Sequence, residues 1–253
     1  MINSAAKGTD INMNYDVIIV GGGPAGLFSA CYLSEHSAKR VLLIEKGKGS
    51  QRRNCPITSY QECIKCKPCN ILSGIGGAGL FSDGKLNYIY KLGKTDLSQF
   101  MSPHQAEKLI EETEEIFNKF GMDGPAYPTD MEEAREIRKR AKRYGIDLLI
   151  IKQKHLGSDR LPEHIACMAD YIKSKGVAIH TSEEVKEVLI ENNHVVGVAT
   201  NCKNYFADNV ILAPGRVGAD WVGGLAQKYG IRLKQRGIEV GVRVEVHKDI
   251  MQD

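Results

Sequence analysis

The main absence in this 253-residue chain is a long apolar run. No stretch approaches the roughly 20 residues that a membrane-spanning helix needs, so a membrane protein of that kind is excluded. Residues 1–12 lack the apolar core of a signal peptide, and we expect them to form a disordered extension of a cytoplasmic protein. The formal net charge of only +3 is too small to indicate a nucleic-acid partner.

Internal repeats and low-complexity segments are also lacking, which argues against a repeat array or a largely disordered chain. What remains is the composition of an ordinary globular protein, with 42% apolar and 26% charged residues. The length suits one large domain or two small ones.

A glycine-rich turn follows the first apolar segment. Asp16–Val20 is rich in Ile and Val, which predicts a buried parallel strand. Gly21, Gly23 and Gly26 then give the pattern G-x-G-x-x-G, and Pro24 stands where a helix would begin. In such a turn the glycines permit a tight bend, close approach of a pyrophosphate, and close packing of helix on strand. The sequence therefore predicts a dinucleotide site at a helix N-terminus, where free N–H groups and the helix dipole favour phosphate.

The second strand of the same unit ends in an acid. The helical pattern runs to about His36, and Val41–Ile44 predicts a second buried strand. Glu45 follows, 19 residues after Gly26, where an acid can hydrogen-bond a ribose hydroxyl. An acid at this place favours an unphosphorylated ribose, so FAD or NAD rather than NADP.

The order of elements in the second half favours FAD over NAD. The predicted elements are a helix at 162–174, a strand at 177–180, a hairpin of 185–190 with 194–200, a meander strand at 205–208, and a buried strand from 209 that ends in the turn 213–215. This order resembles the flavoproteins with two dinucleotide-binding domains. The resemblance implies that Val185 presents its backbone to adenine and that Ala213, Pro214 and Gly215 close over FAD. A plain NAD dehydrogenase would more often lack the meander.

A second glycine-rich segment, Gly74–Asn87, reads GIGGAGLFSDGKLN. Its glycines indicate a backbone that something approaches closely, and its apolar flanks argue against a flexible surface loop. Ser82, Asp83 and Lys85 would bring polar groups to the same place. A lysine beside a flavin can stabilise the charge of the reduced ring, so Lys85 and Asp83 are the candidate catalytic residues. A plain surface lysine is the alternative for Lys85.

Five segments together resemble one family. They are Cys55-Pro56, the run from Cys63 to Asn70, the glycine loop from Ser73 to Lys85, His155–Asp159, and Val240–Glu245. With them the chain resembles the uncharacterised FAD-dependent dehydrogenases, often labelled NAD-utilising dehydrogenases, from about Tyr15 to its end. The resemblance implies an α/β fold, a Rossmann-like parallel sheet with a β-meander, FAD binding and redox chemistry, but no substrate. The expected cofactor-binding residues are Gly21, Gly23, Pro24, Ala25, Gly26, Glu45, Lys46, Gly76, Gly77, Ala78, Gly79, Ser82, Val185, Ala213, Pro214 and Gly215.

Flavoproteins of this type usually carry a late Gly-Asp motif, which is not found here. We therefore expect an N-terminal portion of a longer protein, or a split protein completed by a separate chain. The expected domains are an FAD-binding domain at 13–90 and 161–222, and a partial α+β substrate or cap domain at 91–160 and 223–253. The second domain is expected to hold helices at 103–120 and 129–145, and strands at 148–152 and 237–246. Ser102 and Gln105 predict a capping box at the start of the first of these helices.

Seven cysteines in a chain without a secretion signal indicate reduced thiols, metal or redox chemistry rather than disulfides. Cys55, Cys63, Cys66 and Cys69 give C-P-x6-C-x2-C-x2-C. The last three have the spacing that holds three corners of a 4Fe-4S cluster, with Cys55 as the fourth ligand. Four thiolates also suit zinc. Reduced thiols near a flavin, one or two of them redox-active, are the third alternative.

The sequence thus predicts an FAD-dependent oxidoreductase that passes hydride or electrons between an unknown small molecule and flavin. No second G-x-G-x-x-G domain is found for NAD, so any nicotinamide would bind only transiently as an electron partner. Two alternatives remain open. One is a flavin-dependent RNA- or cofactor-modifying enzyme, which would need an RNA-binding face; the other is an inactive half of a truncated or split flavoprotein.

Overall fold

The computed structural model describes residues 14–157, 159–234 and 245–251. The chain divides into two compact units, Met1–Gly218 and Ala219–Asp253. In the second unit, helix α6 spans Ala219–Lys228 and the 3-10 helix η5 spans Lys248–Met251. The expected extension at 1–12 and nearly all of the strand expected at 237–246 lie outside the described residues. No helix among the described residues is long and apolar enough to cross a membrane.

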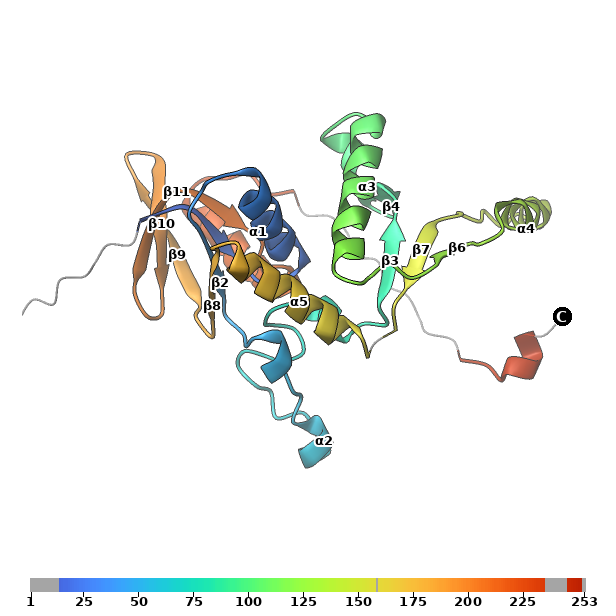
Figure 1. Ribbon diagram of the computed structural model, residues 1–253, viewed down its shortest axis with the longest axis horizontal. Helices are drawn as coiled ribbons and strands as arrows, with labels where there is room; N and C mark the ends of the chain where they lie inside the picture. Colours follow the sequence, from blue (N-terminus) through green and yellow to red (C-terminus); the bar gives the residue numbers. More distant parts are fainter. Residues whose placement is uncertain (1–13, 158, 235–244, 252–253) are drawn as a thin grey trace, which may run out of the picture. The chain divides into compact units, whose positions relative to one another are not determined.

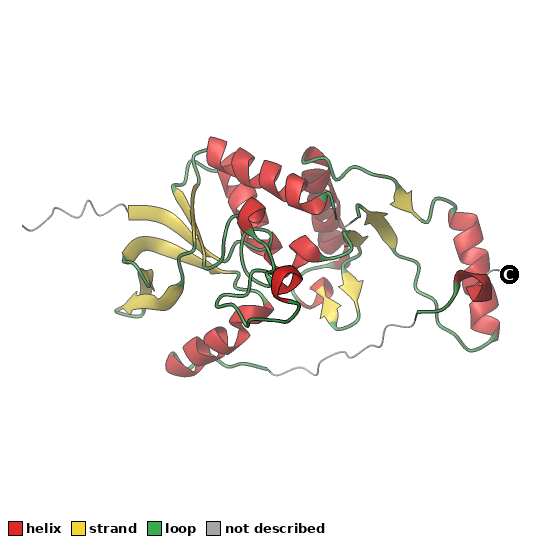
Figure 2. Cartoon of the chain, turned by 90° about the horizontal axis from the view of Figure 1, so that it is seen from below, coloured by secondary structure: helices red, strands yellow, loops and turns green. Residues whose placement is uncertain are grey.

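A six-stranded sheet with the order β8-β2-β1-β11-β10-β9 is the main sheet of the first unit (Figure 1). Its strands are β1 (Asn14–Val20), β2 (Val41–Glu45), β8 (Ala178–Thr181), β9 (Val185–Glu191), β10 (His194–Thr200) and β11 (Asn204–Leu212). Strands β8, β2, β1 and β11 run parallel, whereas β10 is antiparallel to both β11 and β9. The mixed α/β class, with a parallel-rich sheet and a meander, is confirmed (Figure 2).

One continuous strand replaces the two that we expected at 205–208 and 209–212. Strand β11 pairs with β10 through Gly197 and Phe206, and with β1 from Asn14 opposite Phe206 to Val20 opposite Leu212. Asp208 and Asn209 are polar and therefore suggest a break between two strands. Both side chains are exposed, so their polarity does not prevent the strand from continuing through them. The prediction of a separate buried strand was wrong, because the partner strand and not the local pattern sets the length of β11.

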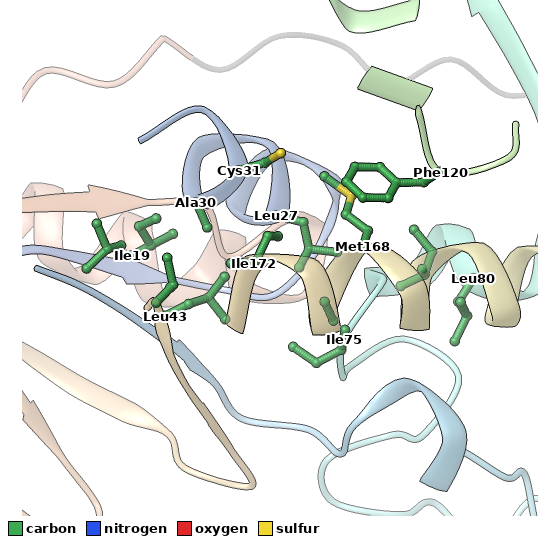
Figure 3. Packing of buried hydrophobic residues seen from close by; sticks show 14 of the residues in the cluster. Ile19, Leu27, Ala30, Cys31, Leu43, Ile75, Leu80, Phe120, Met168 and Ile172 are labelled. Carbon is green, nitrogen blue, oxygen red and sulfur yellow. The ribbon is translucent and has the colours of Figure 1, made fainter. Parts of the chain in front are cut away.

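Helices α1 (Pro24–His36) and α5 (Leu161–Ser174) pack on one face of the sheet (Figure 3). Because side chains alternate along a strand, every second residue of β1 and β2 points to these helices. The resulting core contains Val17, Ile19, Val41, Leu43, Leu27, Ala30, Cys31, Ile165, Met168 and Ile172, all nearly inaccessible to water. Burial of about ten such side chains is the main source of stability for the packing of these helices on the sheet. Both helices agree with the predicted ranges.

A smaller sheet with the order β3-β7-β6 is formed from Lys85–Tyr88, Lys152–His155 and Ala126–Tyr127. Helix α3 (Pro103–Lys119) begins with the predicted capping box, in which Ser102 and Gln105 satisfy each other's backbone N–H groups. Helix α4 spans Met131–Arg143. The remaining elements are α2 (Ile57–Tyr60), β4 (Lys91–Leu92), β5 (Thr95–Asp96), and the 3-10 helices η1 (Ser50–Arg52), η2 (Gly77–Phe81), η3 (Leu97–Gln99) and η4 (Arg216–Gly218).

The strand expected at 148–152 was placed wrongly. Residues 146–151 form neither helix nor strand, and the strand β7 begins only at Lys152. The apolar run Leu148–Ile151 suggested a buried strand, but Leu149 is 58% exposed. Strands β3 and β6 offer their hydrogen-bonding edges to Lys152–His155 instead. Partner strands, which local hydrophobicity does not reveal, decide the register here.

Candidate functional site

The turn after β1 shows why its glycines are required. Gly21 has a φ of +112°, and a Cβ there would lie 2.2 Å from the carbonyl oxygen of Ala213. A Cβ on Gly26 would lie 1.9 Å from the carbonyl oxygen of Gly21, so helix α1 approaches the strand too closely for any side chain. Gly23 is the N-cap of α1 and Pro24 follows at the first helical position. No described side chain caps this end of the helix, and no acid lies in its first turn.

Glu45, at the end of β2, is a buried carboxylate with only 6% of its surface exposed. Its Oε2 accepts the N–H of Gly22 at 2.6 Å, and its Oε1 accepts the N–H groups of Gly47 and Gly74, each at 2.8 Å. A carboxylate has about four acceptor positions, so one remains after these three bonds. Glu45 therefore fastens the glycine turn, the end of β2 and the second glycine-rich loop to one another.

The second glycine-rich loop packs directly on the first. The N–H of Gly76 donates to the carbonyl oxygen of Gly22 at 2.8 Å. Gly77, with a φ of +61°, approaches so closely that a Cβ there would lie 3.0 Å from the Cα of Gly23. Ala78 and Gly79 follow at the exposed start of η2. Two glycine segments that are about 50 residues apart in the sequence thus form one continuous backbone surface.

Two further predicted segments reach the same edge of the sheet. Ala213, just after β11, donates its N–H to the carbonyl oxygen of Val20 at 2.8 Å, and Pro214 and Gly215 follow it. At the start of the meander, Glu183 donates its N–H to the carbonyl oxygen of Glu45 at 3.1 Å, two residues before the buried Val185. The carboxyl ends of β1, β2 and β11 therefore meet at the glycine turn, and the end of β8 is bonded to that of β2, as ligand sites in open α/β sheets require.

A cavity of about 640 Å³ opens beyond the carboxyl ends of β2 and β8. It begins at Lys46, next to the buried Glu45, and includes Ser182, which follows β8. Ser182 has a φ of +59°, an uncommon conformation for a residue with a side chain. The lining residues are Lys46, Gly47, Lys48, Asn54, Cys55, Pro56, Ser59, Ile64, Cys66, Lys67, Pro68, Asn70 and Ser182. The lining combines three lysines with amides, hydroxyls and apolar groups, which suits a polar ligand with negative charge.

The four cysteines expected to bind a metal do not converge. Cys55 and Cys66 line the cavity, whereas Cys63 is exposed and Cys69 is half-buried. Within the described ranges, no group of three or more His, Cys, Asp or Glu side chains is arranged to hold a metal ion. The chain turns through left-handed residues at Gln61 and Lys65 between the cysteines. The C-x2-C spacing is thus present without such a group, and the metal prediction is not supported.

Lys85 and Asp83, the candidate catalytic pair, form a local surface interaction. The Lys85 Nζ lies 3.5 Å from the Asp83 Oδ2, and the two side chains are 52% and 62% exposed. The N–H of Lys85 also donates to Asp83, and this bond lowers the pKa of Asp83. Ser82 accepts the N–H of Gly84 at 3.3 Å. These residues follow the glycine loop in sequence. Among the described residues, however, no hydrogen bond or ion pair joins their side chains to the turn at Gly21–Gly26.

The most consequential side chain that sequence analysis overlooked is Arg53. It is 98% buried, with an exposed fraction of 2%, and its guanidinium donates to backbone carbonyl oxygens between Asn70 and Ile75. Burial lowers the pKa of Arg53, and the nearby Glu45 opposes this effect. One signal in the sequence points to this role. An arginine stands ahead of an irregular loop, and the backbone carbonyl groups of such a loop need hydrogen-bond donors.

Solved structures and one curated protein are similar to this chain. L-amino acid deaminase from Proteus vulgaris matches with a TM-score of 0.51, 18% identity, and coverage of 91% of this chain and 53% of its own. Glycine oxidase from Bacillus cereus matches with a TM-score of 0.50, 19% identity, and coverage of 86% and 59%. These likenesses show the fold alone. LodB of Marinomonas mediterranea, provisionally named as an FAD-dependent oxidoreductase, is 58% identical over 40 residues, which are 16% of this chain and 11% of LodB.

The chain therefore spans little more than half the length of these solved structures, and its match to LodB covers about a tenth of LodB. A match to a protein family covers far more of the present sequence than the match to LodB does. The profile described as FAD dependent oxidoreductase matches residues 16–242, from the first strand past the Ala-Pro-Gly turn. The glycine turn, the buried acid, the parallel sheet and this match agree: the chain belongs to the FAD dependent oxidoreductase family.

Proposed function

We propose that this chain binds FAD along the carboxyl edge of its parallel sheet and serves a flavin-dependent oxidoreductase. The observation that carries the proposal is the convergence of Gly21–Gly26, Glu45, Gly76–Gly77 and Ala213–Gly215 at that edge. Two glycine segments leave backbone exposed where a pyrophosphate could approach. Family membership supports FAD as the ligand.

The residues present fit a dinucleotide in three places. The uncapped N-terminus of α1 offers N–H groups to the pyrophosphate. Glu45 retains acceptor capacity for a ribose hydroxyl beyond its three backbone bonds. The cavity beside Lys46 has the volume and polar lining for the adenosine end, with Val185 at the adjoining start of the meander. When bound, FAD supplies hydride or electron transfer, and the protein positions and tunes it.

Replacement of the buried acid tests this site directly. In Glu45→Gln, one of the two carboxylate oxygens that accept backbone N–H groups is replaced by an NH2 group. That NH2 group is a donor and faces another donor. We expect the Kd for FAD to rise by about tenfold or more, because a buried donor left unsatisfied costs about 1–3 kcal/mol. Flavin fluorescence quenching and an anaerobic absorption spectrum of the purified chain would measure the binding.

Glu111→Gln, at an exposed position on α3, is the matched control and should leave the Kd for FAD unchanged. If wild-type protein shows no flavin binding at micromolar FAD, the proposed function is wrong for this chain. If Glu45→Gln binds as well as wild type, FAD binding stands but Glu45 does not hold the ribose.

A dehydrogenase is the finer proposal within this function. The run of motifs from Cys55 to Asp159 resembles the NAD-utilising dehydrogenases, and NAD would then act as a transient electron partner. Reduced flavoprotein mixed anaerobically with NAD+ should regain the oxidised flavin spectrum faster than a control without acceptor. Faster recovery with oxygen than with NAD+ would favour an oxidase instead. The substrate would be a small molecule, and turnover of candidate substrates requires the same spectroscopic test.

A further inference from the structure

The backbone of Gly74 lies between two buried side chains of opposite charge. On one side, the Oε1 of Glu45 accepts the Gly74 N–H at 2.8 Å. On the other, the Nη1 of Arg53 donates to the carbonyl oxygens of Gly74 at 3.4 Å and Ile75 at 2.8 Å. Glu45 and Arg53 are 6% and 2% exposed. The two charges thus hold the same short segment of backbone from both ends.

Arg53 uses all three nitrogens of its guanidinium on this loop. Its Nε donates to the carbonyl oxygen of Asn70 at 2.9 Å, and its Nη2 donates to that of Ile71 at 2.7 Å. The guanidinium carbon lies 5.0 Å from the centre of the Phe81 ring, at the far end of η2. Lysine could carry the charge but has no planar fork that reaches four carbonyl oxygens at once.

The loop is shaped to the arginine. Gly74 has a φ of +121°, and a Cβ there would lie 2.5 Å from the Cδ of Arg53 and 2.6 Å from the carbonyl oxygen of Lys48. No other residue type could occupy position 74 without displacing the arginine or the backbone. Two residues later, Gly76 donates its N–H to Gly22, within the glycine turn. Arg53 is therefore separated from the glycine turn by a single stretch of fixed backbone.

We propose that Arg53 is a positioning residue for the dinucleotide. Arg53 holds the loop Gly74–Gly79 on the Gly21–Gly26 turn and links that contact to Glu45. This inference rests on the proposed FAD binding. Because Glu45 holds the N–H and Arg53 the C=O of the same residue, Gly74, a ligand that hydrogen-bonds to Glu45 changes the same bond network that fixes the loop. Arg53 does not need to touch the cofactor to act in this way.

Hydrogen exchange of the protein without added flavin tests the positional claim by itself. In Arg53→Ala and Arg53→Lys, we expect amide protection to fall at Ile75 and Gly76, while β1 and β2 keep theirs. Lys154→Met is the matched control, since Lys154 is also a nearly buried cation, 5% exposed, but lies in the small sheet. It should leave exchange at Ile75 and Gly76 unchanged. Unchanged protection in both Arg53 variants would overturn the inference.

FAD titration then tests the link to the cofactor. We expect the Kd to rise about tenfold or more in Arg53→Ala, and to rise nearly as much in Arg53→Lys, since charge alone does not restore the fork. Added guanidinium at millimolar concentration should partly restore binding to Arg53→Ala. If Lys154→Met and Arg53→Lys raise the Kd equally at equal loss of stability, Arg53 acts only through general stability and the inference fails.

The two proposals fail in different ways. A wild-type chain that binds no FAD refutes the proposed function, while the exchange experiment still decides whether Arg53 holds the loop. If wild type binds FAD and the Arg53 variants bind equally well, the proposed function stands and the positioning role is refuted.

Discussion

The glycine edge of the main sheet and the small sheet β3-β7-β6 are built in opposite ways. At the glycine edge, backbone meets backbone: Gly21, Gly26 and Gly77 lie so close to neighbouring backbone atoms that side chains are excluded or barely tolerated. In the small sheet, side chains do the joining, since Lys154 reaches Glu114 at 3.0 Å and Asn118 at 2.6 Å on α3. A backbone surface suits a ligand that must approach closely, whereas a side-chain network suits the joining of two elements.

Gly26→Ala should have the largest effect and would show how little the glycine edge tolerates. Its Cβ would lie 1.9 Å from a backbone oxygen, which cannot move without displacing β1 from α1. We expect a loss of about 4 kcal/mol or more of unfolding free energy, or failure to fold. Urea denaturation followed by circular dichroism would measure it. Gly124→Ala, placed before β6 where nothing lies within 4 Å, should change stability little; equal effects at the two sites would refute the contrast.

Lys154→Met should have an intermediate effect, confined to the small sheet. It removes one partner of the nearly buried Glu114, which keeps Lys152 at 2.5 Å. Removal of one member of a buried pair costs about 3–5 kcal/mol when the other is left alone, so we expect about 2 kcal/mol here. Thermal unfolding would show the loss, and hydrogen exchange should place it in β7 and α3. Loss of protection at the glycine turn instead would show that the two regions are coupled.

The smallest effect on stability is expected from a substitution of Glu35, where α3 meets α1. Lys119 and Tyr171 both donate to Glu35, and these hydrogen bonds, that of Lys119 first, lower the pKa of Glu35 below its ordinary value of 4.5. A lowered pKa stabilises the fold above pH 4.5, and that contribution is lost as the pH falls through the lowered value. Glu35→Gln should therefore cost about 0.5–1 kcal/mol at pH 7 and less at pH 3. Urea titrations at both pH values would decide; an equal cost at both would mean that charge plays no part.

The features that sequence reasoning identified are those with short-range causes. The G-x-G-x-x-G turn, the capping box at Ser102 and the hairpin turn all follow from what neighbouring residues permit. In that turn Asn192 and Asn193 have φ values of +48° and +64°, as a two-residue hairpin of the type I′ form requires. Local conformational rules act on a few residues at a time, so they can be read without the partner elements.

The errors came from features with distant causes. The strand expected at 148–152 had the hydrophobicity but not the partners, and β11 continues past Asp208 because β1 extends beside it. The cysteines at 55, 63, 66 and 69 have a ligand's spacing, but no group of three or more potential ligands is arranged to hold a metal ion in the described part of the chain. Lys85 and Asp83 pair with each other at the surface, and their catalytic role stays a prediction.

The sequence by itself determined the dinucleotide turn, the acid that follows β2 and the α/β class, because glycine spacing and hydrophobic periodicity constrain the backbone locally. Only the tertiary structure decided that Gly76 would lie on Gly22, that Glu45 would bind three separate backbone N–H groups, and that Arg53 would hold the loop between them. Most of those contacts join residues that lie about 20 or more positions apart. Their geometry exists only once the sheet has brought the ends of its strands to one edge.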